Sequence, residues 1–374
     1  MIRLLFVLLS LALVSGKAVA EGGEEILFKP GEFTSSAVCG KCHQDIHAAW
    51  SARSIHARTM ANPDFRGALE EIVPGEQATC LQCHAPTTVV TGDYAVAKPI
   101  TEEGITCDFC HSLKGVDLGR KIPFDLDVGD TKRGPFRNTA VAPHKTAYSE
   151  LHISPELCAS CHEYRNAHGV DVLSTYSEWQ AGPYPDRGVP CQGCHMAIYQ
   201  GKMVATQETD EISRTFINLH AVPGGRSVSQ LRRAFDLDIG EINTEGSRTS
   251  VIVMVTNQAA GHKVPTGFSN RRVKLEVTVP VRERSQTQVR VYERVLNDNR
   301  GKRIRTVARL FTDAVGERSD SRIAPGVTRK ERFVFPKLAK GASVVARLVY
   351  EVDPETREDR GRETEIWLVN ETVP

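Results

Sequence analysis

The sequence predicts a fold in two parts, a mostly α-helical and irregular N-terminal domain followed by an antiparallel β-sandwich. All ten cysteines lie between Cys39 and Cys194, in a part of the chain rich in glycine, proline and short polar stretches. From about residue 246 onward, stretches rich in β-branched residues alternate apolar and polar positions between turn residues, a pattern typical of strands. Such strands over about 125 residues fit an antiparallel β-sandwich. The expected strands are 250–256, 273–279, 289–295, 332–335, 344–352 and 365–369.

The first 20 residues predict a secretory signal peptide. Arg3 gives a positive start, an apolar run follows, and Ala18-Val19-Ala20 provides the small-residue cleavage pattern. The apolar run is too short to span a bilayer, so a membrane anchor is the weaker interpretation. We therefore expect an exported protein, periplasmic or extracellular, with a cysteine-containing domain over 21–226, a connection over 227–245 and the β-sandwich over 246–374.

The cysteines follow one motif, Cys-x-x-Cys-His, which occurs five times and uses every cysteine. This spacing is the attachment signature of c-type haem. On a helix, positions i, i+3 and i+4 share a face, so two thiols can bond the porphyrin edge while the histidine binds the iron. The sequence therefore predicts five covalent haems. The copies are Cys39, Cys42 and His43; Cys80, Cys83 and His84; Cys107, Cys110 and His111; Cys158, Cys161 and His162; and Cys191, Cys194 and His195.

Two other interpretations of the cysteines fit less well. Five disulfides would need no histidine after every second cysteine. Zinc sites also use Cys-x-x-Cys pairs, but five sites that each end in histidine do not group into sets of four ligands. With five haems in the 157 residues from Cys39 to His195, we expect a haem-organised domain, in which short helices and loops surround the porphyrins.

Each motif histidine supplies one axial ligand, so five irons leave five positions to fill. Seven histidines lie outside the motifs, which is enough for bis-histidine ligation throughout. Bis-histidine iron suits electron transfer, whereas an open position would permit substrate binding. The candidate distal ligands are His56, His144, His152, His168, His220 and His262.

The histidines differ in how well their context suits ligation. His262 lies in a loop stiffened by glycine and proline, Gly261–Gly267. His144 and His152 both precede the fourth motif, and one of them can ligate while the other binds a propionate. His47 follows a motif histidine by four residues and is poorly placed to reach the far side of the same haem. Met196 is a weaker candidate because it adjoins His195.

The overall charge is close to neutral. Without the first 20 residues, 45 basic residues face 46 acidic ones, and haem propionates would add negative charge. A nucleic-acid partner would favour a basic footprint, which this composition does not provide. No later stretch is long and apolar enough for a transmembrane helix.

Several stretches resemble a family of secreted multihaem c-type cytochromes related to the tetrahaem cytochrome of ammonia oxidation. The resemblance covers nearly the whole mature chain. Its stretches are Cys39-x-x-Cys-His with Trp50-Ser51 and Ser54-x-His56-Ala57; Cys80-x-x-Cys-His-Ala-Pro86; 104–111; Tyr148-Ser149 through His162; Thr175-Tyr176-x-Glu178-Trp179; 191–196; 261–267; and Asp320-x-Arg322-Ile323-x-Pro325-Gly326.

The resemblance implies electron transfer through closely stacked haems, with distal histidines at His56, His168, His220 and His262 and at one or both of His144 and His152. It also implies that the β-sandwich reaches the haem domain through His262. We expect an electron carrier that exchanges electrons with redox partner proteins. Two alternatives stay open: an oxidoreductase with one open haem acting on a small nitrogen or sulfur compound, and a subunit that self-associates into an extracellular haem filament.

Overall fold

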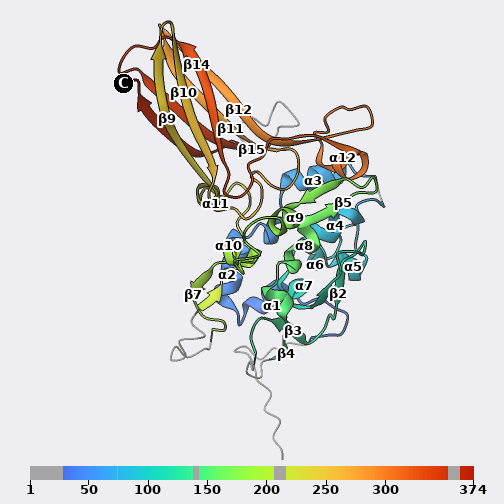
Figure 1. The fold of residues 1–374 in the computed structure, drawn as a ribbon. Coiled ribbons are helices and arrows are strands. Elements are labelled where there is room, and N and C mark those ends of the chain that lie inside the picture. Colours follow the sequence, from blue (N-terminus) through green and yellow to red (C-terminus); the bar gives the residue numbers. More distant parts are fainter. Residues whose placement is uncertain (1–27, 74, 138–142, 206–215, 353–362) are drawn as a thin grey trace, which may run out of the picture.

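A computed structural model describes residues 28–73, 75–137, 143–205, 216–352 and 363–374. The chain forms two parts, one above the other in Figure 1: an N-terminal part coloured blue to green and a C-terminal part coloured yellow to red. The predicted signal peptide, residues 1–20, lies outside the described residues. No helix in the described part of the chain is long and apolar enough to cross a membrane.

The N-terminal part contains short helices separated by loops and small sheets, as expected for a mostly helical and irregular domain. The longest is α2, which ends at Arg53, because Ser54 adopts an extended backbone. The helices are α1 (Ser36–Gly40), α2 (Gln44–Arg53), η1 (His56–Arg58), α3 (Pro63–Glu70), α4 (Ala78–His84), α5 (Thr88–Thr91), α6 (Pro99–Glu102), α7 (Cys107–His111), η2 (Glu150–Ile153), α8 (Glu156–His162), α9 (Thr175–Gln180) and α10 (Cys191–His195).

In the described part of the chain, four two-stranded sheets connect these helices. They are β1 (Leu113–Val116) with β2 (Phe124–Leu126), β3 (Thr131–Gly134) with β4 (Lys145–Tyr148), β5 (Glu163–Arg165) with β6 (Asp171–Ser174), and β7 (Ile198–Gln200) with β8 (Phe216–Asn218). Buried apolar side chains form only small clusters here, such as Met60, Leu69, Leu81 and Ala85. These clusters suit a domain in which a bound group supplies much of the apolar interior.

The C-terminal part contains two antiparallel sheets. The order in one sheet is β14-β10-β9 and in the other β13-β12-β11-β15-β16. Figure 1 shows the first sheet in front of the second. The strands are β9 (Phe235–Glu245), β10 (Arg248–Asn257), β11 (Arg271–Val281), β12 (Arg284–Asn297), β13 (Gly316–Asp320), β14 (Thr328–Pro336), β15 (Ser343–Val352) and β16 (Glu363–Thr372). Each of the six expected strands is present and is longer than predicted.

One hydrophobic core lies against both sheets. Phe235 and Val253 from the first sheet and Leu275 and Leu348 from the second belong to the same buried cluster. Burial alternates along the strands, for example along β10 and β11, so that every second side chain enters this core. The apolar side chains whose alternation predicted the strands therefore also form the core between the two sheets.

Side chains cover one edge of the three-stranded sheet. Gln288 of β12 donates from Nε2 to the carbonyl of Val334 (2.7 Å), and Arg290 donates to the carbonyl of Arg332 (3.2 Å). Both acceptors lie on β14. These bonds satisfy backbone groups that an edge strand leaves free.

The predicted connection over 227–245 is wrong, because this segment is part of the β domain. It forms helix α11 (Val228–Ala234) and the 11-residue strand β9, which pairs with β10 along its length. Phe235, Leu237 and Ile239 alternate with exposed residues, which is the strand pattern itself. The β domain therefore begins close to residue 228 rather than at 246.

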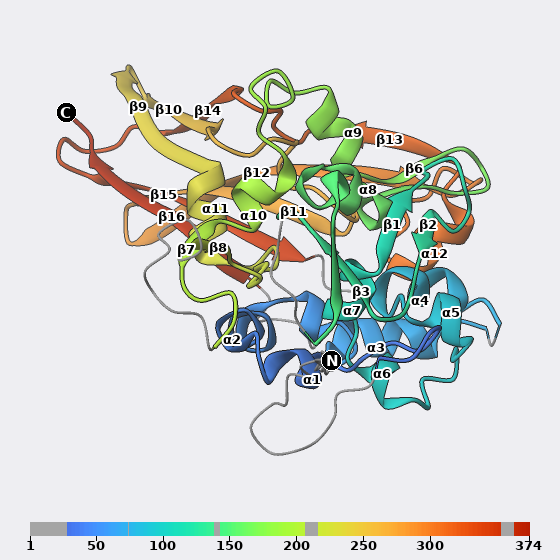
Figure 2. The same cartoon turned by 90° about the horizontal axis from the view of Figure 1, so that it is seen from below.

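One helix of the C-terminal part also connects it to the N-terminal part. Between β12 and β13 the chain forms helix α12 (Val307–Asp313), which packs against the N-terminal part (Figure 2). Leu310 of α12 shares a buried cluster with Val172 of β6. Nδ2 of Asn166 donates to the carbonyl of Ala314 (2.8 Å). The C-terminal part is therefore anchored to the N-terminal part by apolar packing and by buried hydrogen bonds.

Candidate haem attachment sites

The motif cysteines and histidines lie on short helices. Four motifs are complete within α4, α7, α8 and α10, each of which ends at the motif histidine. The first motif is split: α1 ends at Gly40, and His43 precedes the first residue of α2. All ten cysteines are half-buried, and none is paired in a disulfide. The helical spacing that predicts haem attachment is thus present in four copies and interrupted in the first.

Thiols of different motifs contact one another. Hydrogen bonds join Cys39 to Cys107 and Cys83 to Cys161, and each bond raises the pKa of the first thiol and lowers that of the second. The same relation joins the fourth motif to the fifth, between Cys158 and Cys191. These contacts bring the first motif beside the third, and the fourth beside both the second and the fifth.

Cys110 links the two groups of motifs. Burial raises the pKa of its thiol to about 12, and the neighbouring Cys107 and Cys161 add to the effect. Cys161 belongs to the fourth motif, so the third and fourth motifs also adjoin. All five motifs therefore belong to one connected cluster.

Three motif histidines each face a histidine from elsewhere in the chain. The ring centroids of His195 and His262 are 6.3 Å apart, with ring planes 15° apart. The other two pairs are His43 with His144 at 6.2 Å and 32°, and His111 with His220 at 6.4 Å and 31°. Two imidazoles bound to opposite sides of one metal atom by bonds of about 2 Å have ring centroids roughly 6 Å apart. Each pair can therefore hold one iron atom between its rings.

Burial favours the neutral form of four of these imidazoles. It lowers the pKa of His195 and of His220 to about 4, with smaller effects from the neighbouring His262 and His111 respectively. Burial also lowers the pKa of His111 and of His262. A metal ion binds the neutral imidazole, so these histidines are in the ligating form at neutral pH.

Backbone carbonyls orient two of the motif histidines. Nδ1 of His43 lies 2.6 Å from the carbonyl of Met203, and Nδ1 of His111 lies 2.5 Å from that of Arg133. A proton on Nδ1 directs Nε2 toward the metal and makes the imidazole a better ligand. Sequence reasoning missed these two partners, because any residue can supply a backbone carbonyl.

The second and fourth motifs are arranged differently. The ring of His84 stacks on Phe65, with centroids 3.9 Å apart, and its buried Nδ1 has no hydrogen-bond partner among the described residues. Burial, followed by the neighbouring His56, lowers the pKa of His84 to about 4 and that of His162 to about 3. His56 is half-buried, and desolvation lowers its pKa to about 4. It therefore lies close to both motif histidines.

His168 contacts the C-terminal part. Its Nε2 lies 3.0 Å from the carbonyl of Thr312 in α12, and its side chain is exposed. None of the described ring contacts pairs it with a motif histidine. Its role as a distal ligand stays a prediction.

His152 and His47 contact motif residues, but neither ring lies opposite a motif histidine at the roughly 6 Å expected for two ligands of one metal atom. Nε2 of His152 lies 3.0 Å from the carbonyl of Cys110, and its ring stacks on His111 at 5.3 Å. His47 lies against Gly40, where an added Cβ would be 2.6 Å from its ring. Close packing on its own motif agrees with the expectation that His47 is a poor candidate. Between His144 and His152, the ring geometry favours His144 as a ligand.

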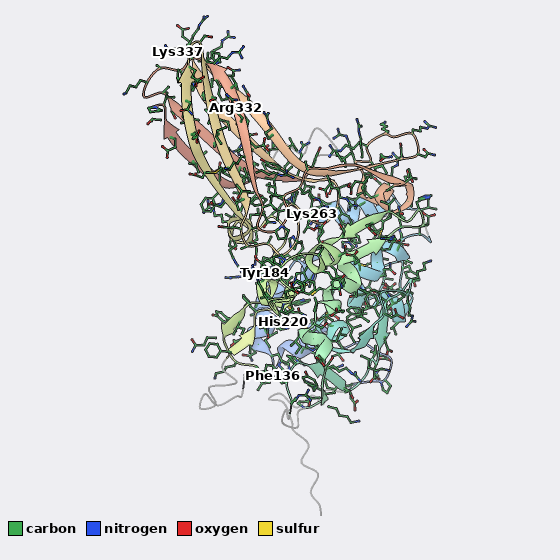
Figure 3. All side chains as sticks on the ribbon, in the orientation of Figure 1. Phe136, Tyr184, His220, Lys263, Arg332 and Lys337 are labelled. Carbon is green, nitrogen blue, oxygen red and sulfur yellow. The ribbon has the colours of Figure 1, made fainter. Side chains whose placement is uncertain are left out.

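The loop that carries His262 packs against the N-terminal part. The hydroxyl of Thr266 lies 2.9 Å from that of Thr175 and donates to Glu178 (3.0 Å). In Figure 3, Lys263 lies where the two parts meet, above Tyr184, and His220 lies lower, within the N-terminal part. The β domain therefore presents a histidine at the fifth motif.

Comparison with known proteins agrees with these observations. The family described as cytochrome c554 and c-prime matches residues 38–112, which contain the first three motifs. With five Cys-x-x-Cys-His motifs on the chain, this match supports a multihaem c-type cytochrome. No curated protein matches the chain significantly.

A solved structure shows the same fold. The chain is similar to a penta-heme cytochrome c552 from Thermochromatium tepidum, with a TM-score of 0.74 and 20% identity over 92% of this chain and all of that chain. A β-glucosidase from Kluyveromyces marxianus shares 9% identity over 37% of this chain and 14% of its own, with a TM-score of 0.17. A likeness that low supports no inference about the β domain.

Proposed function

We propose that this protein is an electron carrier with five covalently attached c-type haems. The observation that carries the proposal is the set of three histidine pairs, in which a motif histidine faces a second imidazole at 6.2 to 6.4 Å. Each haem would supply a one-electron iron couple whose potential depends on axial ligands, burial and nearby charge. Two imidazoles per iron occupy both axial positions, which suits electron transfer rather than substrate binding.

The proposed ligand sets follow from these contacts. His144, His220 and His262 would be the second ligands at the first, third and fifth motifs. His56 lies close to the motif histidines of both the second and the fourth motifs. We assign it to the fourth motif, because the hairpin that carries His168 lies near the second. His168 then remains for the second motif: Tyr164 of β5, in the same hairpin, lies close enough to Cys83 and Cys80 for these thiols to raise its pKa, after burial.

The thiol contacts support an order of attachment sites. The first motif adjoins the third, the third adjoins the fourth, and the fourth adjoins the second and the fifth. Cys39 and Cys191 therefore lie at two different ends of the cluster. We propose that redox partner proteins approach the protein near such ends.

The proposal extends to location and to the second part of the chain. Attachment of c-type haem takes place outside the bacterial cytoplasm, so five such haems imply export, in keeping with the signal pattern of residues 1–20. The two sheets with their common core are proposed to form a β-sandwich. The sandwich would supply His262 to the fifth motif and would not bind a haem of its own.

Haem counting and spectroscopy test this function. A pyridine haemochrome assay on the purified protein is expected to give five haems per chain, and low-temperature EPR of the ferric protein is expected to show low-spin iron throughout. A clear high-spin signal that responds to nitrite or hydroxylamine would overturn the pure carrier function. The mass of the exported protein is expected to correspond to a chain that begins at Glu21 with five haems.

One observation favours the alternative of an open haem. His84 stacks on Phe65 and faces no histidine among the described ring contacts. The second motif is therefore the first place to look for an iron with an open axial position. A small nitrogen or sulfur compound would react at this iron. In the EPR experiment, a high-spin signal removed by replacing Cys80 and Cys83 with alanine would identify this site. Self-association into filaments is tested separately by electron microscopy of the concentrated protein.

A further inference from the structure

Four charged side chains meet beside the loop that carries His262. Arg322 lies at the centre: its guanidinium is 2.6 Å from Glu178 and donates two hydrogen bonds of 2.9 Å to Asp320. Asp320 also accepts a bond of 2.8 Å from Lys263. The side chains of Arg322 and Glu178 are only 4% and 6% exposed. We call Glu178, Lys263, Asp320 and Arg322 the interdomain clamp.

The clamp joins three separate segments. Glu178 belongs to α9 of the N-terminal part, Lys263 follows His262, and Asp320 ends β13. Glu178 carries two more bonds, from the hydroxyls of Ser174 (2.8 Å) and Thr266 (3.0 Å). The histidine loop is thus tied to the N-terminal part on the side of the fifth motif.

Backbone bonds fix the same loop from the other side. Val264 and Ile323 exchange two backbone hydrogen bonds, of 2.9 and 3.0 Å. Nδ2 of Asn257 donates to the carbonyl of His262 (3.0 Å) and to that of Ile323 (3.1 Å). These bonds connect the segment around His262 to the segment around Ile323. A displacement of one segment therefore displaces the other.

Burial makes the clamp sensitive to the loss of one member. Removing one charge from a buried pair leaves its partner unpaired in a poorly solvated place, which is costly. An arginine that grips two carboxylates also has a planar fork that lysine lacks. The expected response to losing Arg322 is a shift of the loop that lets Glu178 and Asp320 reach water.

We propose that the interdomain clamp is a positioning device that holds His262 at ligating distance opposite His195, so that the β domain determines the coordination of the fifth haem. This inference rests on the proposed haem function. Arg322 and Glu178 act through the loop and touch neither the iron nor the porphyrin. The clamp residues carry two positive and two negative charges, so removing one also changes the local field at this site.

The test compares Arg322→Gln with Arg347→Gln in the intact holoprotein. Arg347 also binds several carboxylates, Glu276, Glu363 and Glu365, but it lies on the five-stranded sheet away from the clamp. We expect Arg322→Gln to convert about one fifth of the ferric low-spin EPR intensity to high spin, and free imidazole to restore it. Arg322→Lys, which keeps the charge but not the fork, is expected to show a partial loss. Arg347→Gln is expected to leave the spectrum unchanged.

Three outcomes overturn the proposal. The first is an unchanged spectrum for Arg322→Gln, and the second is an equal loss in Arg347→Gln. The third is a loss that imidazole does not restore, which indicates general unfolding.

If Arg322→Gln yields no folded protein, Glu178→Gln tests the same pair, because glutamine has nearly the same shape as glutamate. His262→Met separates this inference from the proposed function: if it leaves the spectrum unchanged, the ligand assignment fails, whereas a changed spectrum with an inert Arg322→Gln refutes the clamp alone.

Discussion

His262 and His195 lie nearly parallel, 15° apart in plane and 6.3 Å apart between ring centroids, although they come from different parts of the fold. His195 ends α10 of the N-terminal part, and His262 lies between β10 and β11 of the β domain. In the proposed ligand set the β domain holds one axial ligand, which makes it part of the haem site rather than an appendage. The folding of the β domain and the spectrum of the fifth haem are therefore expected to be linked.

The first prediction concerns this pair. Replacing His262 with methionine is expected to change the EPR g values of one of five low-spin sites and to raise its midpoint potential, because a methionine ligand favours ferrous iron more than histidine does. Potentiometric titration followed by visible absorption measures the shift. His47→Gln is the control, since His47 packs on Gly40. Five unchanged potentials in the His262 variant would refute the pairing.

The second prediction separates His144 from His152. His144→Ala is expected to leave one iron without its second ligand, because its ring lies 6.2 Å from His43. A high-spin signal from one site would result. His152→Ala is expected to keep five low-spin sites, because His152 contacts the backbone of Cys110. The reverse pattern in EPR would reassign the ligand to His152.

The third prediction concerns pH and Asp320. Burial acts to raise the pKa of this carboxyl, but hydrogen bonds from Arg322 and Lys263 outweigh it and hold the pKa well below the ordinary value of 3.8. A depressed pKa in the folded state contributes stability above pH 3.8, and this stability is lost as the pH falls through the folded-state value. Asp320→Asn is therefore expected to lower the unfolding midpoint in denaturant at pH 7. The difference from wild type is expected to shrink steadily below about pH 3.8. A difference that is constant from pH 7 to pH 2 would contradict this account.

The fourth prediction concerns the core of the β domain. Phe333 is fully buried within the cluster that both sheets share. Phe333→Ala is expected to lower the free energy of unfolding of this domain by about 3–5 kcal/mol, through lost burial and the cavity left behind. Denaturant unfolding followed by circular dichroism measures the change. Val334→Thr, at an exposed position on the same strand, is expected to change it by less than about 0.5 kcal/mol.

Much of the fold could be predicted because the signals are local. The strands β10, β11 and β15 carry their alternation within ten residues or so, and the five motifs each occupy five residues. Strand β9 carries an equally clear alternation of Phe235, Leu237 and Ile239 with aspartates and a glycine. Strand β13 has no buried residue and could not be found from an apolar pattern.

The site was harder to predict because its geometry depends on distant segments. The sequence contains enough histidines for the irons, but it does not say which ones meet; His111 and His220 are brought together only by the folded chain. Glu178 and Arg322 are 144 residues apart and belong to no common local pattern. Their pairing depends on how the β domain packs against α9, which neither segment encodes alone.

The bonds from Gln288 and Arg290 to the carbonyls of β14 also affect how readily the protein aggregates in concentrated solution. A strand from a second molecule could extend the three-stranded sheet at Val334 and Arg332 only by displacing both side chains. The β14 edge is thereby guarded against strand addition, the route to amyloid-like aggregates.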